Sequence, residues 1–315
     1  MLKFKRAAIG LGASVLMWVG ASASANIIIT PIFDSTITND TTNKTAIETG
    51  INNAIAEVES KILNPISVTI TFQEMGTGLG QSSTFINSLS YSQYRTDLIN
   101  NQTKSANDIT AIATLPATTA NPVNGTNFMT LTLPLLRAIG EPTLGNNGGS
   151  PDGTIGINTS ITNLSRTGPQ DSNKYDLQAV AMHEISEVLG TGGNGSELPT
   201  TTGNIGPLDL FRYGGTGTRS FTTSTAATAY FSIDGGVTHL SPFNQSGGGA
   251  DYADWGSSGT PQVQDAFGTP GSHPDLDSNE VTAFDVVGYN VVPEPASVGL
   301  VVLCGAPLLL RRKLR

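Results

Sequence analysis

Three side chains in one short run of the sequence have the types and the spacing of a metal site: His183, Glu184 and Glu187. If the run is helical, positions 183 and 187 lie one turn apart on the same face, so the imidazole and the carboxylate can bind one ion. Glu184 is rotated from His183 by about 100° around the helix, which places its carboxylate beside the ion. There it can accept a proton from a water whose pKa zinc lowers to about 7, so the run predicts peptide-bond hydrolysis with Glu184 as general base.

A third metal ligand has to come from another part of the chain. We expect it to be Asp209, because this acid is set among apolar residues shortly after the run and could fold back onto it. An aspartate that caps a helix or pairs with Arg212 explains the same position equally well. His239 and His273 are the other two histidines and are alternative ligands. Tyr213 could donate a hydrogen bond to a developing oxyanion, although a packing role explains this tyrosine more simply.

The pattern around these residues predicts the helix that holds them. Residues 176–190 carry apolar side chains on the remaining faces, which would bury the helix, with Asp176 as its N-cap and Gly190 at its end. A buried helix without function would show the same apolar faces. Two carboxylates buried without a partner would be costly, however, and this favours a metal site. The preceding segment 154–161 is expected to be an edge strand that aligns a peptide by β-pairing.

The first part of the chain predicts a strand, a helix and a second strand in close succession. Residues 26–33 are β-branched, 44–61 carry apolar residues at helical spacing, and 66–72 alternate between apolar and polar residues. Two strands joined by one helix form a βαβ unit, so these strands should be parallel neighbours. Further expected elements are a turn at 76–80, helices at 91–100 and 105–114, a strand or helix at 129–139, short strands after 214, and a last helix within 276–289.

Both ends of the chain look like sorting signals of an exported protein. Residues 1–25 combine a basic start, a short apolar stretch and the small residues Ala23-Ser24-Ala25, as a cleaved signal peptide does. Residues 291–315 contain Val292-Pro293-Glu294-Pro295, a hydrophobic stretch and a basic terminus, which together resemble the PEP-CTERM sorting signal. The resemblance implies recognition by an exosortase, transient membrane insertion and removal of the tail, and release to the cell surface or extracellular matrix. An uncleaved membrane anchor is the alternative at either end.

The charge of the chain limits its partners. It has 25 acidic and 16 basic residues and a net charge of −9, and seven of the basic residues lie in the two end segments. The processed protein would be more acidic still, which argues against nucleic acid as a partner and suits divalent cations. The only cysteine, Cys304, lies in the C-terminal segment. The rest of the chain therefore has no disulfide and must rely on its core or on bound metal.

Four internal segments, taken with the two ends, make the chain similar to a family of PEP-CTERM zincin-like metalloproteases: H-E-I-S-E-V-L-G, P-L-D-L-F-R-Y, Y-F-S-I-D-G-G and D-Y-A-D-W. The resemblance implies an α+β, zincin-like fold, with a mixed twisted sheet over an active-site helix and a cleft between two subdomains. It places this domain at residues 26–290, divided into about 26–192 and a part rich in loops and short strands at about 193–290. It also implies Zn²⁺ as cofactor and a protein or peptide as substrate.

The motif departs from the zincin pattern H-E-x-x-H at one position, because Glu187 stands where the second histidine would be. Gly193 occupies the place of the third ligand of metzincins, so Asp209 as third ligand would be similar to the aspzincin arrangement. Two anionic ligands make zinc a weaker Lewis acid and suit harder ions such as Mn²⁺ or Ca²⁺. The departure therefore weakens the expectation of strong catalysis more than that of metal binding.

Two functions follow from these features. The first is a secreted or surface metal-dependent endopeptidase, with Glu184 as base and with His183, Glu187 and Asp209 as ligands. The alternative is an exported surface or matrix protein that keeps the zincin scaffold but cleaves weakly or not at all. In that protein the C-terminal half could bind structural Ca²⁺, although solvated turns explain its acids more simply. The acids in question are Asp234, Asp251, Asp254 and Asp265.

Overall fold

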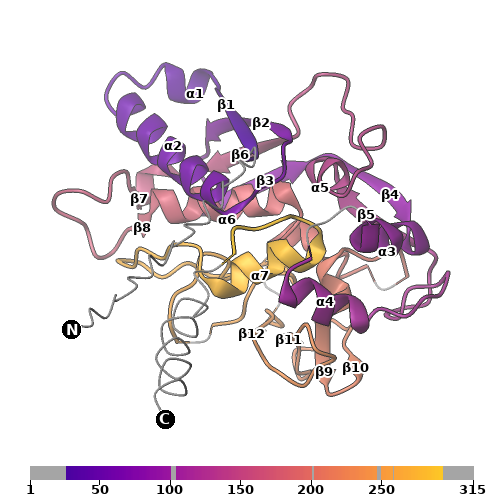
Figure 1. Ribbon diagram of the computed structural model, residues 1–315. Coiled ribbons are helices and arrows are strands. Elements are labelled where there is room, and N and C mark those ends of the chain that lie inside the picture. The colour runs from indigo at the N-terminus through magenta and orange to yellow at the C-terminus, as the bar shows by residue number, and fades with distance from the viewer. Residues whose placement is uncertain (1–25, 101–103, 201, 247–249, 258, 294–315) are drawn as a thin grey trace, which may run out of the picture.

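A computed structural model describes five stretches of the chain, residues 26–100, 104–200, 202–246, 250–257 and 259–293 (Figure 1). The predicted signal peptide at 1–25 and nearly all of the predicted sorting segment at 291–315 lie outside the described residues. The described part combines helices with several small sheets, so the fold class is mixed α+β. None of the helices in this part is long and apolar enough to cross a membrane.

The described chain begins with the strand–helix–strand unit that the sequence predicts. Its elements are β1 (Ile28–Phe33), a short helix α1 (Ser35–Thr38), α2 (Lys44–Lys61) and β2 (Ser67–Glu74). β1 and β2 are parallel neighbours, with Ile29 opposite Val68, which confirms the predicted pairing. α2 has the predicted bounds, because its apolar residues are spaced three or four apart and form one buried stripe.

The main sheet has four strands in the order β1-β2-β6-β3, where β6 is Gly153–Ile157 and β3 is Gly80–Thr84. β6 runs parallel to β2 and antiparallel to β3. The prediction of an edge strand at 154–161 is therefore wrong, because β6 lies inside the sheet with both faces largely buried and gives way to a 3₁₀ turn at Thr159–Ile161. The edge strand next to β6 is β3, and β1 forms the opposite edge. β3 begins at the end of the predicted turn at 76–80, and the sequence does not predict it because its small polar residues lack the apolar alternation of a strand.

Helix α6 (Leu177–Leu189) lies beside α2 on one face of this sheet (Figure 1). Eleven of its 13 residues are buried, including both glutamates of the motif, so the helix belongs to the core. The predicted ends are confirmed. Asp176 accepts a hydrogen bond from the backbone N–H of Ala179, and Gly190 ends the helix at a φ of 96°, in the left-handed region that favours glycine.

The middle of the chain packs beside the main sheet. Its elements are β4 (Ile86–Ser90), α3 (Tyr91–Asn100), α4 (Ala106–Ala113), β5 (Phe128–Thr132) and α5 (Leu133–Ala138). The helices predicted at 91–100 and 105–114 are confirmed as α3 and α4. The ambiguous segment 129–139 contains both alternatives, because β5 pairs with β4 and leads directly into α5.

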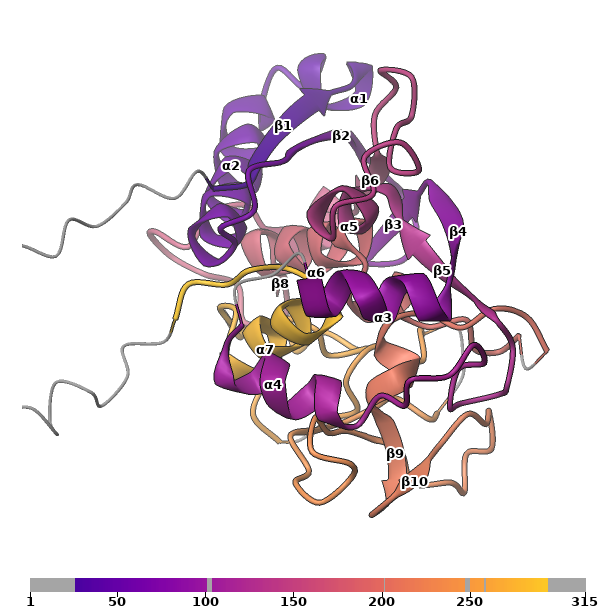
Figure 2. The same cartoon turned by 45° about the vertical axis from the view of Figure 1, so that its right-hand side comes forward.

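The C-terminal half consists of short strands, loops and one helix. Its elements after β7 (Thr162–Asn163) and β8 (Tyr175–Asp176) are β9 (Arg212–Gly215), β10 (Thr218–Arg219), β11 (Tyr230–Phe231), β12 (Ser241–Pro242) and α7 (Ser278–Val287). Four of these strands form the small sheet β10-β9-β11-β12. α7 packs against α4, as Figure 2 shows, and the Tyr289 hydroxyl that follows it donates to the Leu189 carbonyl at the end of α6. The buried apolar residues of both halves form one continuous core, which holds the C-terminal loops close to α6.

Candidate metal centre

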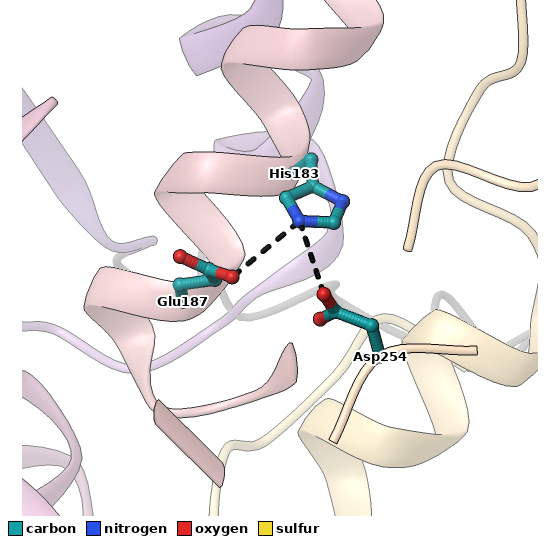
Figure 3. Close-up of side chains that lie close together, drawn as sticks. All are labelled: His183, Glu187 and Asp254. Atoms are coloured by element: carbon teal, nitrogen blue, oxygen red, sulfur yellow. Dashed lines mark ion pairs between the residues drawn. The ribbon is translucent and has the colours of Figure 1, made fainter. Parts of the chain in front are cut away.

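Three side chains that can bind a metal ion converge beside α6: His183, Glu187 and Asp254 (Figure 3). Nε2 of His183 lies 3.4 Å from Oε1 of Glu187 and 3.6 Å from Oδ2 of Asp254. The two carboxylate residues are only 5% and 3% exposed. Within the described residues no other group of three or more His, Cys, Asp or Glu side chains is arranged in this way. A buried group of this composition can hold a metal ion.

The orientation of the His183 ring is fixed by a backbone carbonyl. Nδ1 lies 2.9 Å from the carbonyl oxygen of Val263, and because a carbonyl only accepts, Nδ1 must carry the proton. The neutral ring then presents the lone pair of Nε2 to Glu187 and Asp254. When the ring is neutral, three acceptor atoms face one another, and either a proton on Nε2 or a bound cation can satisfy them.

Each carboxylate of the centre has one oxygen held by a neighbouring side chain and one oxygen that faces Nε2. The Ser82 hydroxyl donates to Oε2 of Glu187 at 2.5 Å, and the Gln264 amide donates to Oδ1 of Asp254 at 2.9 Å. Ser82 reaches Glu187 because it lies opposite Ile155 in the sheet, on the face that covers α6. These supporting donors orient the other two oxygens, as the outer shell of a metal site does.

Glu184 lies one residue further along α6, on the side of the helix that faces β3. It is 5% exposed, and its Oε2 has no hydrogen-bond partner among the described residues. Its carboxylate lies so close to Gly80 of β3 that any side chain at position 80 would collide with it. A buried carboxylate oxygen without a partner is costly to maintain, so a role for it has to be sought in the cavity that it lines.

The charges of this group shift one another's pKa. Burial lowers the pKa of His183, but the carboxylates of Asp254 and Glu187 outweigh burial, so this pKa lies well above its ordinary value. Burial raises the pKa of Asp254 to about 8 and, with the charge of Glu187, raises the pKa of Glu184 well above its ordinary value. Three carboxylates therefore do not all ionise readily beside one imidazole, and a divalent cation would supply the missing positive charge.

The structure does not bring Asp209, the expected third ligand, to this group. Asp209 lies in the 3₁₀ turn Leu208–Phe211 and is 1% exposed. Its carboxylate accepts hydrogen bonds from the Ser196 hydroxyl at 2.6 Å and from the backbone N–H groups of Glu197 at 3.0 Å and Gly206 at 2.8 Å. Both oxygens are used to hold this loop together, so Asp254 occupies the third position of the centre instead.

The remaining candidates from the sequence have other surroundings. His239 stacks on the ring of Tyr230 with a centroid distance of 3.4 Å, and Nδ1 of His273 lies 3.8 Å from Oδ1 of Asp176. Tyr213 is buried in β9 with a hydroxyl that lacks a partner among the described residues, and it does not line the cavity over the centre. None of these three side chains belongs to the group around His183.

The four acids considered for calcium are divided between different places. Asp234 closes a turn by accepting hydrogen bonds from Ser232, Val237 and Thr238. Asp254 belongs to the centre, and Asp251 and Asp265 line the cavity above it. They are not one calcium site.

A local signal for Asp254 exists, but it does not single the residue out. Asp254 stands between the buried residues Ala253 and Trp255, and Asp209 stands in the same way between the buried residues Leu208 and Leu210. An acid between two buried residues therefore marks both positions. Only the folded chain shows which carboxylate reaches His183.

A cavity of about 620 Å³ lies over the centre. Its lining includes the α6 residues of the motif, the segment 77–82 that contains the start of β3, and parts of the C-terminal loops at 250–254 and 261–269. The β3 edge of the sheet thus borders the same cavity as His183 and Glu184. The space above the centre is large enough for part of a peptide.

The backbone of β3 offers hydrogen-bonding groups toward this edge. The Leu79 carbonyl accepts a hydrogen bond from the Asn158 N–H, and the Phe85 N–H donates to the Asp152 carbonyl. Asp152 and Asn158 directly precede and follow β6. Backbone groups of an antiparallel strand alternate in direction, so Gly80 and Ser82 point theirs away from β6. Among the described residues no hydrogen bond is found for the backbone groups of Gly80 or Ser82 on that side. A second extended chain could pair there.

Comparisons of the chain with protein-family models, with curated proteins and with solved structures found no match. Any assignment of function therefore rests on the geometry of the centre and its cavity.

Proposed function

We propose that the protein is a metal-dependent endopeptidase with a zincin-like architecture. His183, Glu187 and Asp254 hold one divalent cation, expected to be Zn²⁺, and Glu184 is the general base. The proposal replaces Asp209 by Asp254 in the ligand set and keeps the other roles that the sequence motif predicts.

Two separations, both measured from Nε2 of His183, carry this proposal, and all three ligand atoms lie within 4.8 Å of one another. Tetrahedral zinc binds nitrogen and oxygen ligands at about 2.0–2.2 Å, so two ligand atoms of the same ion lie about 3.4 Å apart. The distances of 3.4 and 3.6 Å from Nε2 of His183 agree with this spacing. They are longer than the roughly 2.7–2.9 Å of a charge-assisted hydrogen bond. The atoms are spaced to surround an ion rather than to share a proton.

The arrangement of sheet and helix supports the same proposal. The resemblance in sequence implies a mixed sheet over an active-site helix, and here a sheet with one antiparallel edge strand covers α6. The edge strand β3 borders the cavity in which His183 and Glu184 lie. This is the relation that a peptidase needs in order to align an extended substrate with its catalytic groups.

The chain's own residues divide the work of hydrolysis in a simple way. A bound divalent cation would supply a Lewis acid that polarises the scissile carbonyl and makes water more acidic. Glu184 takes the proton of the attacking water on Oε2, the oxygen of its carboxylate that has no partner, and passes it to the leaving amine. Gly80 leaves room for that carboxylate, and the backbone groups of Gly80 and Ser82 bind the peptide in register.

The test combines metal analysis with cleavage of a denatured protein such as casein. The purified protein should contain close to one equivalent of a divalent metal and should cleave casein in a chelator-sensitive way. Glu184→Gln should keep the metal and lose about 10²–10⁴-fold in rate. Asp254→Asn should lose metal, whereas His239→Ala, outside the centre, should match the wild type. Absence of metal, or an active Glu184→Gln variant, would refute the proposal. A metal-loaded wild type that cleaves nothing would favour the non-catalytic surface protein instead.

Export and processing belong to the same proposal. The basic and apolar start of the chain, the Pro-Glu-Pro tail and the acidic composition support a protein that an exosortase sorts to the cell surface or matrix. Mass spectrometry of the protein recovered from its source should find a first residue near Asn26 and no peptide from the extreme C-terminus. Recovery of an intact tail in the mature protein would contradict this part of the proposal.

A further inference from the structure

The described residues that line the cavity over the centre include six acids but no lysine or arginine. The six acids come from different elements: Asp176, Glu184, Glu187, Asp251, Asp254 and Asp265. Among the described residues that line it, His183 is the one side chain that can carry positive charge. A cavity walled by one sign of charge concentrates ligands of the opposite sign.

Four of the six acids have a partner or a task that removes their charge. Asp176 pairs with Arg166, which also reaches Asp275. Glu187 and Asp254 would be neutralised by a divalent cation bound with the neutral His183 ring. The fourth acid is Glu184, which takes up a proton as the general base during the reaction. These four do not attract a substrate charge on their own.

Asp251 and Asp265 have no lysine or arginine as an ion-pair partner among the described residues. Oδ2 of Asp265 accepts a hydrogen bond from the Gln262 N–H at 2.9 Å, whereas its Oδ1 is buried with no partner among the described residues, and the residue is 8% exposed. The exposed Asp251 carboxylate has no lysine or arginine within salt-bridge distance among the described residues. The exposed carboxylate of Asp251 and the buried carboxylate of Asp265 can therefore pair with a positively charged group of a substrate.

The position of Asp251 next to the centre follows from Gly193. A Cβ atom placed at Gly193 would lie 2.6 Å from Oδ2 of Asp251 and 2.6 Å from Oε1 of Glu187. The absence of a side chain at position 193 therefore lets Asp251 come within a few ångströms of a metal ligand without belonging to the ligand group. A substrate group that pairs with Asp251 must lie close to the scissile bond.

We infer that the enzyme selects peptides with a lysine or arginine side chain near the scissile bond, and that Asp251 is the residue that selects them. The inference rests on the proposed peptidase function. A peptide paired with β3 enters the cavity that Asp251 and Asp265 line, so a basic side chain beside the scissile bond can reach the open carboxylate. An acidic side chain there would face two charges of its own sign.

The experiment identifies cleaved bonds by mass spectrometry after digestion of a denatured proteome, and then measures kcat/KM on matched peptides. The matched peptides carry Lys, Gln or Glu at the position that the digest identifies. We expect Lys or Arg to be enriched near the cleaved bond, and the Lys peptide to be cleaved at least tenfold faster than the Gln peptide. Asp251→Asn should bring this ratio close to one, and Asp251→Lys should favour the Glu peptide. Glu48→Gln removes the same charge from the surface of α2 and should leave the ratio unchanged.

The outcomes separate the two proposals. Cleavage without a preference for basic residues, or a preference that persists in Asp251→Asn, overturns the inference and leaves the peptidase function intact. A metal-loaded protein that cleaves no bond overturns both. A loss of metal in Asp251→Asn would show that Asp251 is a ligand, and it also overturns the inference.

Discussion

The hydroxyl of Ser82 provides a test of the centre that needs no substrate. It donates to Oε2 of Glu187 at 2.5 Å, and Glu187 is 5% exposed, so water cannot easily replace it. In Ser82→Ala the carboxylate loses the contact that turns Oε1 toward Nε2 of His183. A hydrogen bond to a charged group contributes about 1.5–3 kcal/mol. At 1.4 kcal/mol for each factor of ten, the metal should bind about 10- to 100-fold more weakly.

The assay is a titration of the metal-free protein with zinc in the presence of a chelator of known affinity. The matched control is Ser83→Ala, because the next residue of β3 points its side chain to the opposite face of the sheet. Its zinc affinity should stay within about twofold of the wild type. Equal affinities of Ser82→Ala and the wild type would refute the reasoning, and so would equal losses in both variants.

Further predictions concern the surroundings of the centre. Gly80→Ala should destabilise the protein by about 1–3 kcal/mol and slow peptide cleavage with metal still bound, because the new methyl group meets the Glu184 carboxylate; thermal melting and turnover measure both effects. Asp209→Ala should cost about 3 kcal/mol or more in the free energy of unfolding, since three donors lose their acceptor, yet the folded protein should keep its metal. A metal-free but folded Asp209→Ala would contradict this. Burial raises the pKa of Asp285 to about 7, so the folded protein keeps a proton that the unfolded chain releases above about pH 4. Stability should therefore fall between pH 4 and pH 7, and less so in Asp285→Asn; urea unfolding across this range checks the sign.

The elements that the sequence predicts well are those with a strong local pattern. α2 has apolar residues at helical spacing and a break at Asn64-Pro65, and α6 has Asp176 and Gly190 at its two ends. The parallel pairing of β1 and β2 follows from the short helical connection between them. In each case the information lies within a few turns of chain.

β3 shows what the local pattern lacks. Its residues Gly80 to Thr84 are small and polar, and they form a strand because β6 supplies a partner, not because of their own preference. The interior position of β6 could not be predicted either, because it depends on β2 and β3 as neighbours on its two sides. An edge strand can be recognised only when its neighbours are known.

The centre was predictable only to the extent that it lies on one helix. His183, Glu184 and Glu187 share α6, so their relation follows from helical geometry. The third carboxylate belongs to a separate loop. Whether Asp209 or Asp254 supplies it depends on how the C-terminal half packs over α6. The Gln264 amide and the Val263 carbonyl, which orient the centre, belong to that same half.

The central claim is that one divalent cation is bound by His183, Glu187 and Asp254. Crystallographic anomalous scattering at the zinc edge, on protein supplied with zinc, tests it most directly. The claim predicts one strong peak about 2.0–2.2 Å from Nε2 of His183 and from one carboxylate oxygen each of Glu187 and Asp254. A zinc-free centre, or a peak that is ligated by Asp209 in place of Asp254, would contradict it.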